Sequence, residues 1–240
     1  MPTHLILRLE GPLQAWGDVA MDPRRPTRAF PSRSALAGLL ANALGWTYRD
    51  AARTTALQDA LRYAVREDRR PQVLRDYQTA DLGAIGDTGW TRWGLERRGG
   101  GSKEGTQILE KFYLADGCFR VALSLGPDAS VSMDDVAEAL RRPARPLLLG
   151  RKGCPPATPL LEPLRVEAES PRDAIRQVPA PEHAAPDAVL RCWYDAGPDE
   201  APGTVMEVWY RRDFGTNQFA GARRVAEGRI EVSSLPREAA

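Results

Sequence analysis

The stretch LILRLEGPLQAWG, residues 5–17, decides how the fold of this chain begins. Residues 3–9 are typical of a β-strand and end at a Gly-Pro pair, which predicts a first strand followed by a turn. Farther along, leucine and alanine recur at helical spacing after Ser32 and Ser34, either of which can cap a helix that Gly45 ends. The first elements are therefore expected to be a strand, a long loop and a helix.

The next part of the chain repeats this order. Residues 50–61 predict a second helical stretch that leads into a half-exposed strand at residues 62–67. The same alternation recurs at residues 119–125, and Ser132 with two following acids predicts the start of another helix. Two βαβ units predict an α+β fold, a ferredoxin-like (RRM-like) βαββαβ sandwich. In it, two helices cover one face of a four-stranded antiparallel sheet and the other face stays available.

The sequence leaves the position of the fourth strand open. It is expected at residues 145–149 or at residues 164–167, in a region where repeated prolines exclude a central strand. With either choice, the ferredoxin-like body is expected to cover residues 1–78 and 107–169.

Two further regions are expected outside this body. Residues 79–106 are rich in glycine and lack a periodic apolar pattern, which predicts a projecting or mobile insertion, here called the thumb. A disordered insertion whose tryptophans fold back onto the core is the alternative. Residues 170–240 are expected to form a C-terminal β-rich subdomain, in which residues 188–194 and 204–210 pair as a hairpin.

Composition argues against several classes of protein. The 240 residues can bury a core without disulfides, and Cys118, Cys154 and Cys192 lack the CxxC or Cys/His spacing of a zinc site. No metal-binding or nucleotide-binding motif is present, so neither a metal nor a cofactor is expected. The N-terminus lacks the features of a signal peptide, and no run reaches the ~18 apolar residues of a membrane span. These features predict a cytoplasmic protein without membrane contact.

Positive charge is clustered, although the net charge is only +1. Residues 21–35 hold four arginines and one acid, and residues 141–152 hold five basic residues and no acid. Basic loops suit phosphate binding, above all before a helix, where free backbone N–H groups attract anions. The RNA-binding candidates in these clusters are Arg24, Arg25, Arg28, Arg33, Ser34, Arg145, Arg151 and Lys152. The strongest single site is the turn in which glycines flank Arg151 and Lys152, and a solvated surface position is the alternative for each residue.

Aromatic and amide side chains add further RNA-binding candidates. Gln14 can read a base edge, and Trp16 can stack on a base unless it packs in the core. The thumb interleaves aromatic residues with cations, which suits stacking on bases and neutralising phosphates. Its candidates are Arg92, Trp93, Arg97, Arg98 and Lys103.

Four phrases of the sequence resemble one protein family. They are LILRLEGPLQAWG at 5–17, RPTRAFPSRSALAGLL at 25–40, LRDYQTA at 74–80 and LLLGRKGCP at 147–155. In sequence and spacing these segments are similar to the CasD subunits of Cascade, the type I-E CRISPR effector, whereas beyond Glu169 the resemblance becomes weaker. Arg75 and Tyr77 match a family motif at the base of the thumb, which implies contact with RNA. Asp76 beside them offers a simple salt bridge instead.

The resemblance implies a RAMP protein with a defined place in a ribonucleoprotein complex. It would bind the 5′ handle of the CRISPR RNA and cap one end of the row of CasC backbone subunits. It would also touch the large subunit CasA and other Cascade subunits, and so act indirectly in target DNA recognition and antiviral defence. Because a different subunit, CasE, cuts the guide RNA in this subtype, the resemblance implies a protein that is not an enzyme.

Two other functions stay open. A guide-RNA-processing endoribonuclease of the same fold commonly uses histidine as acid or base. Here His4 lies in the first strand and His183 in a Pro/Ala-rich stretch, both away from the basic loops in sequence. Tyrosine with lysine can in principle replace histidine, and the candidates are Tyr77, Tyr113, Lys111 and Lys152. A free-standing RRM-like binder is disfavoured, because neither central strand carries the RNP1 pattern.

Overall fold

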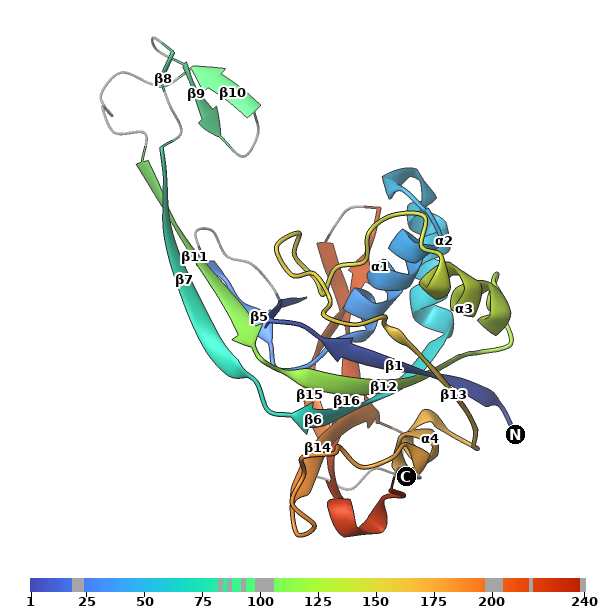
Figure 1. The fold of residues 1–240 in the computed structure, drawn as a ribbon. Coiled ribbons are helices and arrows are strands. Elements are labelled where there is room, and N and C mark those ends of the chain that lie inside the picture. Colours follow the sequence, from blue (N-terminus) through green and yellow to red (C-terminus); the bar gives the residue numbers. More distant parts are fainter. Residues whose placement is uncertain are drawn as a thin grey trace.

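The body of the protein is built on one seven-stranded sheet. The computed structural model describes residues 1–18, 24–81, 84–85, 88–91, 94–97, 106–196, 205–215 and 218–237. Figure 1 shows the sheet, whose strand order is β13-β1-β12-β6-β14-β16-β15 with antiparallel pairing throughout. The strands are β1 Thr3–Glu10, β6 Leu61–Arg69, β12 Cys118–Leu125, β13 Leu161–Glu167, β14 Val189–Asp195, β15 Val205–Asp213 and β16 Gln218–Glu231.

Capping side chains set where the helices begin. The Ser32 hydroxyl accepts a hydrogen bond from the backbone N–H of Ala35 at the start of α1, and Gly45 follows its end at φ +79°. Ser132 forms a capping box at the start of α3, and Ser170 caps α4. The starts of α1 and α3 confirm the sequence prediction, with Ser32 rather than Ser34 as the first cap. The helices are α1 Arg33–Ala43, α2 Ala51–Ala60 after a 3-10 turn at Tyr48–Asp50, α3 Met133–Arg141 and α4 Pro171–Gln177.

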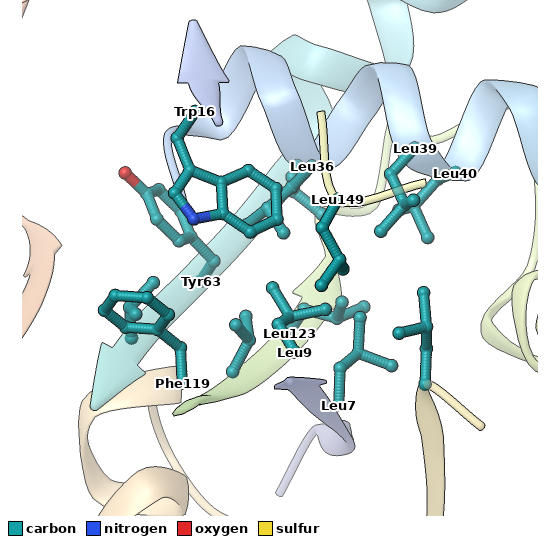
Figure 2. Packing of buried hydrophobic residues seen from close by; sticks show 14 of the residues in the cluster. Leu7, Leu9, Trp16, Leu36, Leu39, Leu40, Tyr63, Phe119, Leu123 and Leu149 are labelled. Carbon is teal, nitrogen blue, oxygen red and sulfur yellow. The ribbon is translucent and has the colours of Figure 1, made fainter. Parts of the chain in front are cut away.

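One face of the sheet carries the larger hydrophobic core. Alternate side chains of β1, β6 and β12 point to this face, among them Leu7, Tyr63 and Leu123, and pack against α1, α2 and α3. Figure 2 shows Leu36, Leu39 and Leu40 of α1 above these strand residues, with Leu149 between them. Each fully buried leucine contributes about 1.5–3 kcal/mol, so this layer is the main source of the body's stability.

The second face is covered, which corrects the expectation that it stays available. Small side chains of the central strands pack there with Ala174 and Ile175 of α4. Arg66 is fully buried beneath α4 and donates to the carbonyl oxygens of Ile175 (3.2 Å) and Val178 (2.8 Å), while its Nε lies 2.6 Å from an Asp68 oxygen. The β6 strand is therefore buried on both faces over most of its length, and the prediction that it is half-exposed is wrong.

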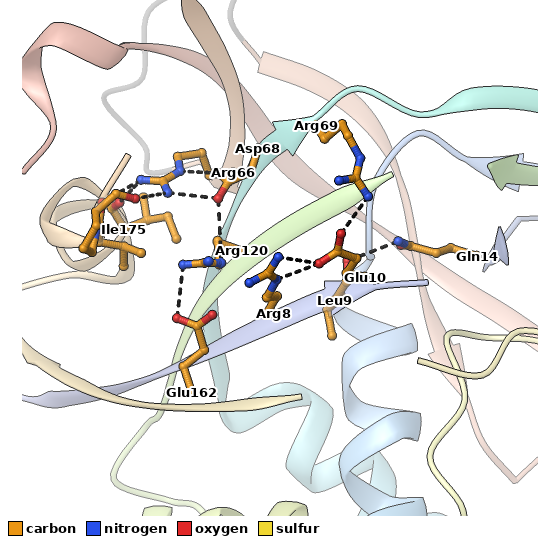
Figure 3. Close-up of polar contacts among 12 residues, drawn as sticks. Arg8, Leu9, Glu10, Gln14, Arg66, Asp68, Arg69, Arg120, Glu162 and Ile175 are labelled. Atoms are coloured by element: carbon orange, nitrogen blue, oxygen red, sulfur yellow. Dashed lines mark hydrogen bonds and ion pairs between the residues drawn. The ribbon is translucent and has the colours of Figure 1, made fainter. Parts of the chain in front are cut away.

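A row of paired arginines crosses this second face. The strand register places Arg8 beside Arg120, and Arg120 beside Arg66. Figure 3 shows their acidic partners: Glu10 accepts from Arg8 (2.7 Å), and Glu162 accepts from Arg120 (3.1 Å). Each of these guanidiniums has a carboxylate partner, so the row stabilises the sheet and offers little free positive charge.

A long two-stranded ribbon extends away from the body. β7 Gln72–Asp81 and β11 Thr106–Ala115 pair over ten positions, from Gln72 with Ala115 to Asp81 with Thr106 (Figure 1). The ribbon thus begins at Gln72, before the predicted start of the insertion at residue 79. Short strands accompany it: β2 Leu13–Gln14 and β4 Arg24–Arg25 pair with β11, and β3 Trp16–Gly17 pairs with β5 Thr27–Arg28. In the part of the chain that follows β7 and precedes β11, three short strands form a small sheet: β8 Ala84–Ile85, β9 Thr88–Thr91 and β10 Gly94–Arg97.

The C-terminal strands continue the main sheet. β14 pairs with β6, with Trp193 opposite Val65, and β16 lies between β14 and β15. The expected hairpin of residues 188–194 with 204–210 is therefore wrong, because both runs pair with β16 instead of with each other. The Trp193 ring stacks on Phe30 at 4.6 Å, which ties these strands to the N-terminal part. Of the two positions left open for a further strand, residues 145–149 form none, whereas β13 agrees with the second position.

Candidate nucleic-acid interface

Two short strands bring arginines to the base of the ribbon. β4 runs parallel to β11, which places Arg24 beside Glu110 and Arg25 beside Lys111. Both arginines are exposed, and the Arg24 guanidinium lies 4.9 Å from the centre of the Phe112 ring. Exposed guanidiniums held on a strand are suited to phosphate contacts that fix a nucleic-acid backbone.

Arg151 fastens its loop to this base. Its Nη1 donates to the carbonyl oxygen of Phe112 (2.8 Å), and its Nη2 donates to those of Arg25 (2.8 Å) and Pro26 (3.2 Å). Its guanidinium also lies 4.8 Å from the centre of the Tyr113 ring. Because both of its terminal nitrogens donate to these backbone carbonyls, Arg151 is placed to hold β4 against β11.

The glycine-framed turn serves the protein's own backbone. Gly150 has φ +99°, and a Cβ at this position would lie 1.8 Å from the carbonyl oxygen of Ala15. Glycine is therefore required at position 150 for two chain segments to approach each other. Lys152 in the same turn is exposed, and no described residue gives it a hydrogen bond or an ion pair.

Arg75 and Tyr77 lie on one exposed face of the ribbon. Arg75 forms an ion pair with Glu110 across the ribbon, and not with the neighbouring Asp76, whose carboxylate accepts from Gln78 (2.6 Å). The Arg75 guanidinium lies 5.9 Å from the Tyr77 ring, and Tyr77 is 54% exposed. The tyrosine ring is therefore available to a partner, whereas the charge of Arg75 is partly satisfied.

Gln14 and Trp16 point inward. The Gln14 side-chain amide donates to the carbonyl oxygens of Leu9 (3.1 Å) and Gly117 (2.8 Å), and its oxygen accepts from the Trp16 indole N–H (3.1 Å). Trp16 is 1% exposed and belongs to the main core (Figure 2). The structure thus assigns both to the core, in agreement with the alternative for Trp16 and against base reading by Gln14.

Two arginines of the first cluster are also buried. Arg28 lies 2.7 Å from Asp18, and burial lowers the pKa of Arg28 to about 10, so it stays charged at neutral pH. Arg33 at the start of α1 forms an ion pair with Asp195 of β14. The cluster that is continuous in sequence is therefore divided: Arg24 and Arg25 face outward, whereas Arg28 and Arg33 are buried in ion pairs.

Arg145 and Ser34 likewise have partners within the protein. Arg145 donates to the Asn42 side-chain oxygen (2.9 Å) and to the carbonyl oxygen of Trp46, so it satisfies groups at the end of α1. The Ser34 hydroxyl lies 3.2 Å from that of Ser32 and is half-buried. These contacts favour structural roles for both residues.

The thumb candidates lie largely outside the described residues. Arg92, Trp93, Arg98 and Lys103 are outside them, and Arg97 is described only as part of the backbone of β10. Their predicted contacts with RNA stay predictions.

Two arginines that the sequence did not single out join Arg24. Arg70 follows β6, and Arg191 lies on β14; together with Arg24 they line a cleft of about 410 Å³ at the base of the ribbon. Arg70 follows Arg69 in a stretch whose charge is offset by Glu67 and Asp68, and Arg191 has no basic neighbour, so charge clustering gave no signal. Only the pairing of β14 with β6 and of β4 with β11 brings them together.

Neither histidine is among the residues that line this cleft. His4 is fully buried on the α4 side of the sheet, and His183 is exposed in the segment between α4 and β14. Across the described residues, no three His, Cys, Asp or Glu side chains come together as metal ligands would. None of the helices in the described ranges has the length and apolar character needed to cross a membrane.

Comparisons with known proteins give consistent relatives. A family model described as "CRISPR-associated protein (Cas_Cas5)" matches residues 4–225. The curated "CRISPR system Cascade subunit CasD" of Escherichia coli (strain K12) is 40% identical over 168 residues, which cover 67% of this chain and 70% of that protein. A solved structure titled "CRISPR RNA-guided surveillance complex" is similar with a TM-score of 0.69 and 29% identity, covering 95% of this chain and 90% of that one. Another, titled "Crystal structure of Cas protein", has a TM-score of 0.68 and 28% identity, covering 99% of both chains.

Proposed function

The chain belongs to the CRISPR-associated Cas5 protein family, and from this premise we propose that it binds the 5′ handle of a CRISPR RNA and caps one end of Cascade without cutting the RNA. This membership confirms the resemblance to CasD drawn from the sequence motifs. A role in Cascade follows from the same likeness. The binding of the handle and the position at one end of the complex are the proposal.

The observation that carries this proposal is the set of exposed cations at the base of the ribbon. Arg24 and Lys152 have no acidic partner among the described residues, and Arg25 is exposed beside Arg24. Uncompensated cations attract a polyanion and hold it through its phosphates. The exposed Tyr77 ring on the same ribbon supplies a surface on which a base can stack.

We assign the four strands at one end of the main sheet, β13, β1, β12 and β6, to the ferredoxin-like class. The order β13-β1-β12-β6, with α1 and α3 packed on one face, supports this assignment. We further assign the ribbon and the residues between its strands to the projecting thumb. In this arrangement the body supports the thumb, and the exposed cations lie where the two meet.

A binding role is favoured over RNA cleavage. His4, the histidine nearest the N-terminal motifs, is fully buried on the α4 side of the sheet. It cannot reach an RNA held at the ribbon base without opening the sheet. An endoribonuclease of the same fold remains the second candidate, with Tyr113 and Lys111 of β11 as the residues that would have to act.

Partners are assigned from the same premise. We propose that the protein contacts the CasC backbone subunits, the CasA large subunit and the other Cascade subunits, and that target DNA is engaged only through the complex. The exposed apolar side chains Leu74 and Ile108 on the ribbon supply apolar surface for protein contacts.

Salt dependence of RNA binding tests the proposed interface. The variant Arg24→Ala/Lys152→Ala removes two exposed cations, and Arg141→Ala/Arg142→Ala on α3 removes the same charge elsewhere. The first pair is expected to flatten the plot of log affinity against log salt by about 0.7 for each lost phosphate contact, and the second to leave it unchanged. Equal slopes for the two double variants would contradict the interface.

A further inference from the structure

The cleft at the base of the ribbon joins parts of the chain that lie far apart in sequence. β4 and the residues after it form one wall, the start of β7 and the end of β11 form another, and β14 adds a third. Its lining residues are Arg24, Pro26, Thr27, Ala29, Arg70, Pro71, Val73, Phe112, Leu114 and Arg191. Its volume of about 410 Å³ lies in the range of pockets that hold small organic ligands.

The charged groups of the cleft are unbalanced. Arg191 is paired with Glu67, with Nε–Oε1 at 3.2 Å and Nη2–Oε2 at 2.7 Å, and this pair raises the pKa of Arg191. Arg70 is exposed and has no ion pair with any described residue, and Arg24 contacts only the Phe112 ring there. With three guanidiniums and one paired carboxylate, the cleft favours an anionic ligand.

The apolar part of the lining favours an anion that is attached to an apolar group. The register sets Val73 opposite Leu114, and the next pair on that face is Arg75 opposite Phe112, so the apolar side chains share the face that lines the cleft. Val73 is 69% exposed, which leaves an uncovered apolar surface beside the free guanidiniums. A flat base linked through a ribose to a phosphate matches both parts, whereas inorganic phosphate matches only one.

We propose that this cleft holds one unstacked nucleotide of the guide RNA, with its base against Val73 and Phe112 and its phosphate at Arg70 and Arg24. The inference rests on the proposed function, since it takes single-stranded RNA to be the ligand. Arg191, which Glu67 orients, completes the site from β14. The C-terminal strands are therefore part of the RNA site and do more than extend the sheet.

The charge of the cleft is tested with matched exposed arginines. Arg70→Ala in the full chain is expected to lower the affinity for 5′-labelled single-stranded repeat RNA about five- to tenfold, and to flatten the salt slope by about 0.7. Arg142→Ala removes an equal charge from the end of α3, where the side chain is 86% exposed, and is expected to change affinity less than about twofold. Arg191 is not the test residue, because its removal leaves Glu67 buried without its partner.

Base occupancy is tested by an abasic scan. Placing an abasic nucleotide at each position of the RNA in turn is expected to weaken binding at one position in the unaltered protein. That penalty should vanish in Val73→Asp. Because Val73 is exposed, this variant is expected to stay folded, and a melting curve compared with that of the unaltered protein checks this. A penalty that persists in Val73→Asp, or appears only with DNA of the same sequence, would overturn the proposal.

The remaining outcomes separate this proposal from the one on which it rests. If the unaltered chain does not retain the RNA at all, the proposed function fails. If the RNA is retained and Arg70→Ala behaves like Arg142→Ala, only the cleft proposal fails. If Arg70→Ala keeps the RNA affinity but loses assembly with the other subunits, the cleft is assigned to a protein partner and the cleft proposal is overturned. Competition by inorganic phosphate, together with no effect of abasic sites, would also overturn the cleft proposal.

Discussion

Arg151 joins the loop before β13 to the ribbon through the carbonyl oxygen of Phe112, 2.8 Å from its Nη1. The same guanidinium binds two carbonyl oxygens of the segment that carries Arg24 and Arg25. One side chain therefore sets the position of the outward cations, although its own charge faces the protein.

Replacement of Arg151 separates positioning from charge. Arg151→Ala is expected to destabilise the fold by about 1.5–3 kcal/mol, because charged hydrogen bonds to the backbone are lost, and to weaken RNA binding. Arg151→Lys keeps the charge but not the planar fork that reaches three carbonyls. If it binds RNA as weakly as Arg151→Ala does, the positioning role holds, and full recovery of affinity would show that charge alone matters.

Gly150 and Gly153 give a matched pair for backbone strain. Gly150→Ala is expected to destabilise the protein by more than about 3 kcal/mol, since the new Cβ overlaps the carbonyl oxygen of Ala15 and φ is positive. A Cβ at position 153 would meet no atom within 4 Å, so Gly153→Ala should change the free energy of unfolding by less than about 0.5 kcal/mol. Urea denaturation of both variants measures the difference, and equal effects would contradict the close approach of the two segments.

Much of the body of the fold could be predicted from the sequence, but the candidate site could not. Strands β1 and β12 and helices α1 and α3 have local signals, namely alternation, helical spacing and capping serines, and each was predicted near its true bounds. The ribbon was missed because its strands mix polar and apolar residues on both faces, as in LRDYQTA, so no periodic pattern marks them.

The inward candidates were misjudged because their partners are distant in sequence. Gln14 bonds to the carbonyl oxygen of Gly117, which is 103 residues away, and Arg33 pairs with Asp195, which is 162 residues away. A basic cluster looks the same in sequence whether its charges are paired or free. The decision between a core role and RNA contact therefore depended on tertiary contacts.

The buried pair of Arg66 and Asp68 predicts a strong non-additive effect. Arg66→Met alone is expected to destabilise the protein by about 3–5 kcal/mol, because Asp68 is left charged and buried while the carbonyls after α4 lose their donor. Arg66→Met/Asp68→Leu should recover a large part of that loss. A double variant as unstable as the sum of the single ones would show that the two side chains do not act as a pair.

His4 predicts a loss of stability in mild acid. Burial lowers the pKa of His4 below that of a free histidine, so the unfolded chain binds a proton that the folded protein resists. Stability is then complete above the unfolded value of about 6.5 and falls as the pH drops below it. The acids with lowered pKa, such as Glu10, lose their contribution only at lower pH.

The variant His4→Leu isolates this effect. The free energy of unfolding, measured by urea titration from about pH 8 to about pH 5, is expected to fall less steeply with acid in His4→Leu than in the unaltered protein. His183→Gln, at the exposed histidine, serves as the control for the loss of a histidine as such. Parallel profiles for the unaltered protein and His4→Leu would contradict the neutral buried state of His4.

The most direct test of a binding role without catalysis uses one RNA and two gels. The purified protein is incubated with 5′-labelled repeat RNA in EDTA, and the mixture is run on a native gel for retardation and on a denaturing gel for cleavage. The account predicts a retarded band, weakened in Arg24→Ala/Lys152→Ala, with the RNA intact on the denaturing gel. Specific cleavage at the boundary of the 5′ handle would contradict it and would direct attention to Tyr113 and Lys111 as the reacting groups.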